Sequence, residues 1–150
     1  MRFHLIDRID KWQAHERLVG RKATAPDEEY WQASPRGPVM PAGLVVEALA
    51  QAGTWLLLLS SDCQQRAALG SVAKAEWSSE VVPGEVLEMD VSLVSYNDSA
   101  AVFEGTVSVG DRRVLDIDGM VCAVLDSSLL EDPLDTARMG RRLLRTEALR

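Results

Sequence analysis

Hydrophobic and polar residues alternate along the second half of the chain. In residues 85–96 an apolar side chain stands at nearly every second position, with acidic residues or serine between. Such alternation with a period of two is typical of a β-strand that buries one face. It predicts further strands at residues 101–109 and 112–125, although the last becomes apolar on both faces. Turn residues at 97–99 and 110–111 favour hairpins between them, so we expect an antiparallel meander.

One long apolar helix is predicted before these strands. Residues 44–60 (LVVEALAQAGTWLLLLS) are apolar on nearly every face, and Pro41 stands where a proline is tolerated, in the first turn of a helix. A helix of this kind must be enclosed by protein. It also contains Glu47, and a carboxylate inside a membrane span is costly, so we expect a core helix and no membrane span.

The first forty residues are predicted to form loops and a short strand. Residues 17–24 (RLVGRKAT) are a candidate edge strand, whereas residues 25–41 contain four prolines and cannot be regular structure. Residues 71–78 (SVAKAEWS) are a further candidate strand after the helix. An antiparallel sheet wrapped around the helix buries both apolar surfaces most simply, which gives an α+β domain. Because one helix covers such a sheet poorly, we also expect a dimer.

Composition limits the classes of protein to consider. The 150 residues are 47% hydrophobic and 26% charged, which suits one globular domain. Two cysteines, without a CxxC or Cys/His cluster, indicate neither a disulfide framework nor zinc. A net charge of −7 argues against a general nucleic-acid binder. Residues 1–10 lack the apolar core of a secretory signal, so we expect a reducing, cytoplasmic setting.

Charge is distributed unevenly along the chain. Five arginines against one glutamate give residues 136–150 a net charge of +4, so residues 1–135 carry −11. We therefore divide the chain into a domain at 1–135 and a basic C-terminal tail or helix at 136–150. Such a segment is suited to an acidic partner, although a solvated terminal helix needs no partner.

Residues 38–53 (PVMPAGLVVEALAQAG) resemble the active-site segment GHFPGxPVMPGxLxxEALAQ of the FabA/FabZ-type 3-hydroxyacyl-[acyl-carrier-protein] dehydratases. Further stretches match that family in order. FHLIDRI at 3–9 is similar to its PFLLVDRV, LGSVAK at 69–74 to a sheet strand, and VPGE at 82–85 to its VxPGD turn; residues 114–126 are similar to its last strand. The resemblance implies the hotdog fold, a long helix wrapped by an antiparallel sheet.

The resemblance also implies a chemistry, the elimination of water from a 3-hydroxyacyl thioester. In that family a histidine removes the C2 proton, and a carboxylate on the central helix, contributed by the other subunit of a dimer, assists departure of the hydroxyl. Carried over to this chain, the carboxylate is Glu47, and Gln51 is a hydrogen-bond partner near it. Ala42 and Gly43 supply the backbone N–H groups that polarise the thioester carbonyl, since the start of a helix leaves such groups free.

The family's histidine is missing from this chain. The matching position, fourteen residues before Glu47, is Ala33, which cannot accept a proton. His4, in the segment similar to PFLLVDRV, and His15, in a polar stretch, are the only histidines in the sequence and the only ones that could replace the missing base. An unassisted dehydratase would be slow, because loss of a general base costs a factor of about a hundred to ten thousand.

Other residues carry weaker expectations. Tyr30 and Trp31 stand where the family has aromatic residues and would line an acyl tunnel or pack in the core. Arg36, beside the expected entrance, would meet a phosphopantetheine phosphate or an acidic carrier protein, or simply be a solvated loop residue. Cys63 and Cys122 are expected to be inert thiols, since no cationic neighbour is apparent in the sequence.

Three functions remain open at this point. The chain is a dehydratase-like subunit of fatty-acid or polyketide-type biosynthesis that completes a site with a histidine-bearing paralogue. Alternatively it is a homodimeric hotdog thioesterase that uses Glu47, or a non-catalytic subunit that binds acyl thioesters or their carrier protein. None of the three needs a metal or redox cofactor, because phosphopantetheine arrives with the substrate on acyl carrier protein or coenzyme A.

Overall fold

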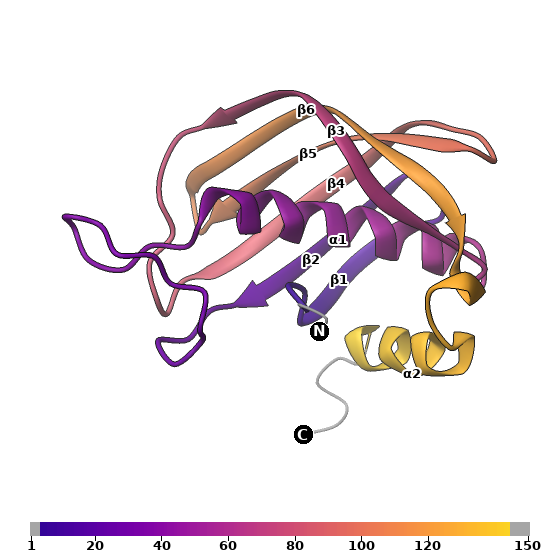
Figure 1. Cartoon of the computed structure of the whole chain (residues 1–150), viewed down its shortest axis with the longest axis horizontal. Coiled ribbons are helices and arrows are strands. Elements are labelled where there is room, and N and C mark those ends of the chain that lie inside the picture. The colour runs from indigo at the N-terminus through magenta and orange to yellow at the C-terminus, as the bar shows by residue number, and fades with distance from the viewer. Residues whose placement is uncertain (1–3, 145–150) are drawn as a thin grey trace.

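The computed structural model describes residues 4–144, which form an antiparallel sheet curved around one long helix (Figure 1). The sheet has six strands in the order β1-β2-β4-β5-β6-β3, and α1 lies in its concave face. A short 3-10 turn and a second helix, α2, follow the last strand. The elements are β1 (Arg8–Gln13), β2 (Arg17–Ala23), α1 (Ala42–Ser60), β3 (Gln65–Trp77), β4 (Val86–Tyr96), β5 (Ala100–Val109), β6 (Arg112–Asp126), η1 (Ser127–Leu129) and α2 (Pro133–Leu144).

The predicted meander is confirmed, because β4, β5 and β6 are consecutive antiparallel neighbours. The alternation places the apolar side chains of β4 against α1, where Leu87, Met89 and Val91 are fully buried. In β6 the inward-facing positions change from odd to even numbers at Gly119, a bulge with φ +67°. This change interrupts the alternation of apolar and polar residues in the middle of the strand.

Two predictions about the strands are wrong in detail. The segment at 17–24 is not an edge strand, because β2 pairs with β1 on one side and β4 on the other. Strand β1 escaped notice because a strand with one neighbour and mostly exposed side chains shows no apolar alternation. Strand β3 begins six residues earlier than expected, in a stretch (QRAAL) that also lacks alternation.

Helix α1 packs closely on the sheet because a glycine stands at the contact on each side, one in α1 and one in β5. A Cβ added to Gly53 of α1 would lie 3.3 Å from the ring of Phe103, and one added to Gly105 of β5 would lie 3.0 Å from Leu49. Leu49 and Phe103 are fully buried between the two layers. The core therefore lies between α1 and the concave face, as the sequence predicts.

Helix α2 continues the chain across position 135. Thr136, Gly140 and Leu143 are buried, and a Cβ at Gly140 would lie 3.2 Å from the Trp55 ring of α1. The basic segment is thus helical as far as Leu144, while residues 145–150 lie outside the described residues. Within residues 4–144, only α1 is long and apolar enough to cross a membrane, and 61% of its apolar window is buried in protein.

Candidate functional site

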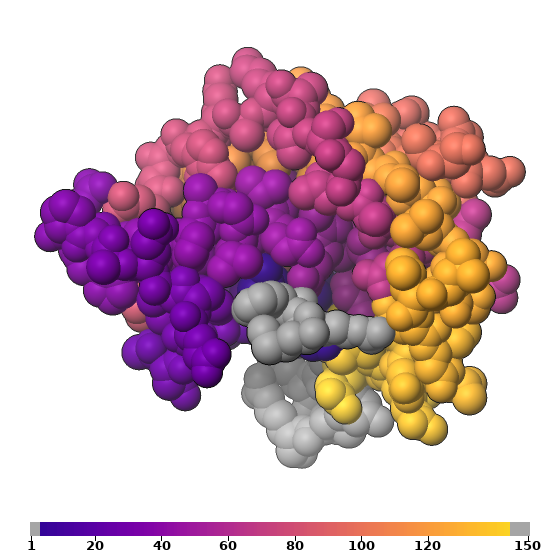
Figure 2. All heavy atoms as spheres, viewed as in Figure 1, coloured from indigo at the N-terminus to yellow at the C-terminus, as the bar shows by residue number. Residues whose placement is uncertain are grey.

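Glu47 lies in a pocket of about 620 Å³ that follows α1 from Glu47 to Leu58. The pocket floor is formed by α1 and by the first residues of β3, and its rim includes the segment before β1 and the segment before α2. Figure 2 shows α1 partly uncovered on this side of the molecule, between β3 and α2. Its lining residues are His4, Glu47, Ala50, Gln51, Thr54, Trp55, Leu58, Arg66, Ala67, Ala68, Leu69, Leu130 and Glu131.

Gln51 fixes the position of Glu47 within this pocket. One helical turn separates the two residues, and the Gln51 Nε2 group donates to Glu47 Oε1 at 3.4 Å. The Gln51 Oε1 atom accepts the backbone N–H of Leu5 at 2.8 Å. The side-chain amide therefore connects the N-terminal segment to the carboxylate, and the hydrogen bond expected between Glu47 and Gln51 is present.

A buried thiol lies near the carboxylate. Cys122 of β6 is 1% exposed, and burial raises the pKa of its thiol to about 11, with the negative charge of Glu47 adding to the effect. Burial likewise raises the pKa of the Cys63 thiol. Both shifts oppose thiolate formation, so these cysteines are poorly suited to act as nucleophiles.

The start of α1 opens onto a different groove. Ala42 and Gly43 are exposed, and the first residues of a helix have N–H groups without intrahelical acceptors. Pro41 provides no side-chain cap for them. Ala42 lines a pocket of about 630 Å³ with Arg36 and Trp77, whereas Glu47 and Gln51 line the other pocket. Within one subunit, the structure does not bring these two groups of residues into a single cavity.

Ala33 lies in an exposed segment that projects from one end of the sheet (Figure 1). Gln32 and Val39 exchange backbone hydrogen bonds at its base, and Ser34 and Gly37 close the tip. Ala33 does not line the Glu47 pocket. Arg36 connects this segment to Glu80, just beyond the end of β3, through an ion pair of 2.7 Å.

Tyr30 and Trp31 pack against the core at the base of the same segment. Their ring centroids are 5.0 Å apart, and the Trp31 indole N–H donates to the backbone oxygen of Ala25 at 2.9 Å. Burial raises the pKa of the Tyr30 hydroxyl, and Glu28 adds to the shift. Neither ring lines the Glu47 pocket, so in one subunit both support the Ala33 segment.

Several pocket residues were not found from the sequence. Arg66 and Glu131 form an ion pair at the rim, although 65 positions separate them in the chain. Of the two histidines considered as replacements for the missing base, His4 lines the Glu47 pocket and His15 does not. Within residues 4–144, no group of three or more His, Cys, Asp and Glu side chains is placed to hold a metal ion.

The fold and site together define a hotdog protein with a carboxylate on its central helix. A family model described as a FabA-like domain matches residues 1–118. The 3-hydroxyacyl-[acyl-carrier-protein] dehydratase FabZ of Clostridium kluyveri is 34% identical over 113 residues, which cover 74% of this chain and 78% of the relative. The same enzyme of Enterococcus faecalis is 33% identical over 111 residues, covering 73% and 77%. The chain therefore belongs to the FabA-like family.

Solved structures agree on the architecture. The protein smu.793 of Streptococcus mutans UA159, bound to acetyl-CoA, aligns with a TM-score of 0.64 at 12% identity, covering 84% of this chain and 94% of the other. PH1136 of Pyrococcus horikoshii aligns with a TM-score of 0.64 at 15% identity, covering 85% and 88%. At such identities the likeness concerns the fold alone.

Proposed function

We propose that the chain is a dehydratase-like subunit that acts on 3-hydroxyacyl thioesters and uses Glu47 as its catalytic carboxylate. The observation that carries this proposal is Glu47 itself, hydrogen-bonded to Gln51 in a pocket on the central helix, in a chain of the FabA-like family. The 34% identity to FabZ supports acyl carrier protein as the carrier of the substrate. Fatty-acid and polyketide-type pathways are the settings that use such substrates.

The sheet supports a dimer formed along β3. This strand is an edge of the sheet, and most of its second half is exposed. Leu69 and Trp77 on this strand are 39% and 44% exposed and would be covered by such a neighbour. A second subunit that paired there would continue the sheet and cover the uncovered strip of α1.

Antiparallel pairing of β3 with its copy brings the two halves of the site together. The Glu47 pocket is lined by Ala67, Ala68 and Leu69, near the beginning of β3. The Ala33 segment is tied by Arg36 to Glu80, just beyond the end of β3. In an antiparallel pair the end of one strand lies beside the beginning of the other. Position 33 of one subunit thus approaches Glu47 of its partner.

This arrangement assigns a role to each group. A base at position 33 of the partner removes the C2 proton, and the N–H groups of Ala42 and Gly43 stabilise the charge that develops on the thioester oxygen. Glu47 donates the proton with which the 3-hydroxyl leaves as water, and the double bond forms between C2 and C3. The base holds one proton and Glu47 has given one up, so a proton returns to the carboxylate before the next cycle.

Because position 33 is alanine here, we propose that a histidine-bearing paralogue completes the site of Glu47. The reaction needs no metal or redox cofactor, since the thioester carries its own phosphopantetheine. In such a heterodimer the site that combines Ala33 with the paralogue's carboxylate would be inactive. The homodimer would lack a base in both sites.

The test is dehydration of a 3-hydroxyacyl thioester by the chain alone, by a mixture with a FabZ-type paralogue from the same source, and by the Ala33→His variant. We expect the mixture to be active even when the paralogue's own carboxylate is removed. Glu47→Gln in this chain should then abolish that activity. We expect Ala33→His to raise the activity of the homodimer by about a hundredfold or more. Gln32→His, which adds a histidine one position away, is the matched control and should stay inactive.

Three results would contradict the proposal. One is a mixture and an Ala33→His variant that are both as inactive as the folded wild-type chain. Another is thioester hydrolysis by the wild-type homodimer that Glu47→Gln abolishes, because that would make the chain a thioesterase. The third is dehydration by the wild-type chain alone that His4→Gln removes, because the base would then be His4 and not residue 33 of a paralogue.

A further inference from the structure

Helix α2 is an amphipathic helix with an arginine-rich outer face. Its inner face packs on α1 through Gly140 and Leu143. On its outer side Arg138, Arg141 and Arg142 are exposed. The helix lies beyond residue 118, where the match to the FabA-like domain ends.

These arginines differ from the other basic residues because their charge is largely unneutralised. Within residues 4–144, every other Arg and Lys except Lys11 forms an ion pair with a carboxylate. Arg141 and Arg142 form none with the described residues, and Arg138 contacts Asp135 only at 3.5 Å with 70% of its side chain exposed. Favourable interaction with the helix dipole explains arginines in the last turn but not Arg138. In a chain of net charge −7, this face is an isolated positive surface.

Helix α2 begins close to the Glu47 pocket. Leu130 and Glu131 line that pocket, and they stand three and two residues before Pro133, the first residue of α2. Trp55 lines it as well, and this is the ring on which Gly140 packs. A macromolecule bound to α2 would therefore lie near this pocket.

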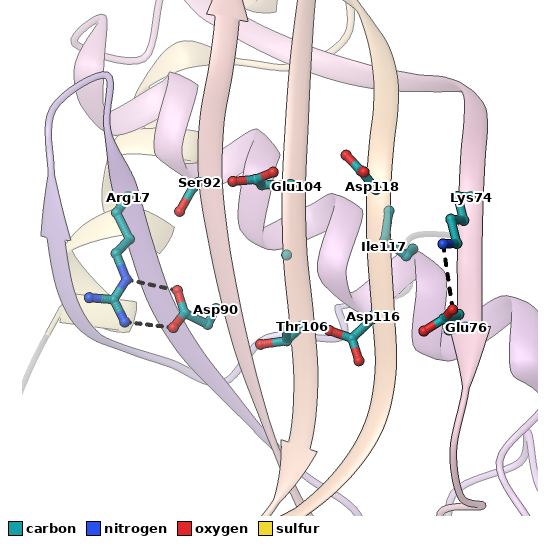
Figure 3. A pocket seen from close by; sticks show the side chains of 11 residues that line it. Arg17, Lys74, Glu76, Asp90, Ser92, Glu104, Thr106, Asp116, Ile117 and Asp118 are labelled. Atoms are coloured by element: carbon teal, nitrogen blue, oxygen red, sulfur yellow. Dashed lines mark hydrogen bonds and ion pairs between the residues drawn. The ribbon is translucent and has the colours of Figure 1, made fainter.

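The opposite side of the molecule would repel an acidic partner. Figure 3 shows the outer face of the sheet, where Asp90, Glu104, Asp116 and Asp118 project into a shallow hollow. The cations there are engaged, since Arg17 binds Asp90 through two hydrogen bonds and Lys74 pairs with Glu76. Charge therefore favours approach of an acidic protein from the side of α2.

We propose that Arg138, Arg141 and Arg142 form the docking surface for an acidic carrier protein, which presents its acyl thioester to the Glu47 pocket. The inference rests on the proposed function for the identity of the partner. The surface itself is defined by the position of α2 and by its unneutralised charge. Arginine suits this task because its guanidinium group binds carboxylates in a two-pronged manner and remains charged at any physiological pH.

The test compares two triple variants of the full chain that lose the same charge. One is Arg138→Gln/Arg141→Gln/Arg142→Gln, on α2. The matched control is Arg17→Gln/Arg21→Gln/Arg113→Gln, on the outer face of the sheet, where each arginine is exposed and paired with an aspartate. Circular dichroism and thermal unfolding establish that both variants are folded.

The first readout is binding of 3-hydroxyacyl carrier protein from the same source, measured by calorimetry at low and at physiological salt. We expect the α2 variant to bind at least about tenfold more weakly than the wild type and to lose most of the salt dependence. The sheet variant should bind at least as well as the wild type. Unchanged binding by the α2 variant, an equal loss in both variants, or no binding by the wild-type chain would each overturn the proposal.

The second readout separates docking from chemistry. In the mixture with the paralogue, the α2 variant should show a raised KM for the carrier-linked substrate and an unchanged kcat. Its turnover of the N-acetylcysteamine thioester, which is small and uncharged, should equal that of the wild type. Loss of turnover on both substrates would contradict a docking role. The chain could also bind the carrier protein through α2 and yet show no dehydratase activity in the mixture. That result would support the docking surface and refute only the proposed function.

Discussion

The two faces of the sheet use neighbouring residues in opposite ways. On the concave face, Phe103 and Met89 are completely buried under α1. On the convex face, Glu104 and Asp90 project into solvent from adjacent positions of the same two strands (Figure 3). The concave face is held by apolar burial, and the convex face by exposed ion pairs. Because exposed pairs are worth little, nearly all the stability of the sheet must come from the concave side.

The two faces also differ in how they hold their carboxylates. The carboxylate of Glu47 lies on the concave side, where α1 and β3 form a pocket. Carboxylates on the convex side are more numerous but lie in a shallow hollow that is open to water. The number of charged groups on a surface is thus a poor indicator of a functional site. Enclosure in a pocket and a hydrogen-bond partner for the carboxylate are better indicators.

The largest contrast is expected between Phe103→Ala and Glu104→Ala. Truncating the buried ring on which Gly53 packs should lower the free energy of unfolding by about 3–5 kcal/mol. The neighbouring glutamate faces water, and its truncation should change that free energy by less than about 0.5 kcal/mol. Chemical denaturation with equal m-values in both variants is the measurement. Similar losses in the two would mean that the faces do not differ in this way.

A pH dependence of stability is expected from the buried thiol of Cys122. The pKa of the Cys122 thiol rises from an ordinary 9.0 to about 11 on folding, so the native state holds this proton more tightly than the unfolded chain. Stability is therefore lost as pH rises from 9 towards 11, by about 3 kcal/mol from this group. Denaturant titrations of the wild type and of Cys122→Ala across this window are the check. The variant should show a visibly shallower decline, and an equal slope would refute the assignment.

The smallest effect is expected on the convex face, at the ion pair of Arg17 and Asp90. Its two hydrogen bonds of 2.8 and 2.5 Å give good geometry, but the side chains are 50% and 30% exposed. A double-mutant cycle with Arg17→Gln and Asp90→Asn should give a coupling energy of at most about 1 kcal/mol. That coupling should shrink further in 0.5 M salt. A value that salt leaves unchanged would show that the pair is shielded from solvent.

Sequence reasoning succeeded where each residue's role depended on its near neighbours. The alternation in residues 85–96 predicted both the strand and its buried face, and the apolar run at 44–60 predicted the central helix within two residues of its start. It failed at β1, whose mostly exposed residues carry no periodic signal. It also missed the ion pair of Arg66 and Glu131, because no local pattern relates residues so far apart in the chain.

For the site, the sequence by itself determined the chemical groups: Glu47 and Gln51 one helical turn apart, and an alanine where the resembled family has its histidine. Spacing along a helix fixes which side chains share a face, so this part could be read from the chain. Only the tertiary structure decided that the N-terminal segment contacts Gln51, that the segment before α2 lies at the rim of the Glu47 pocket, and that Ala33 lies outside it. These relations join segments distant in sequence, and they are set by packing around a common core, which no local pattern encodes.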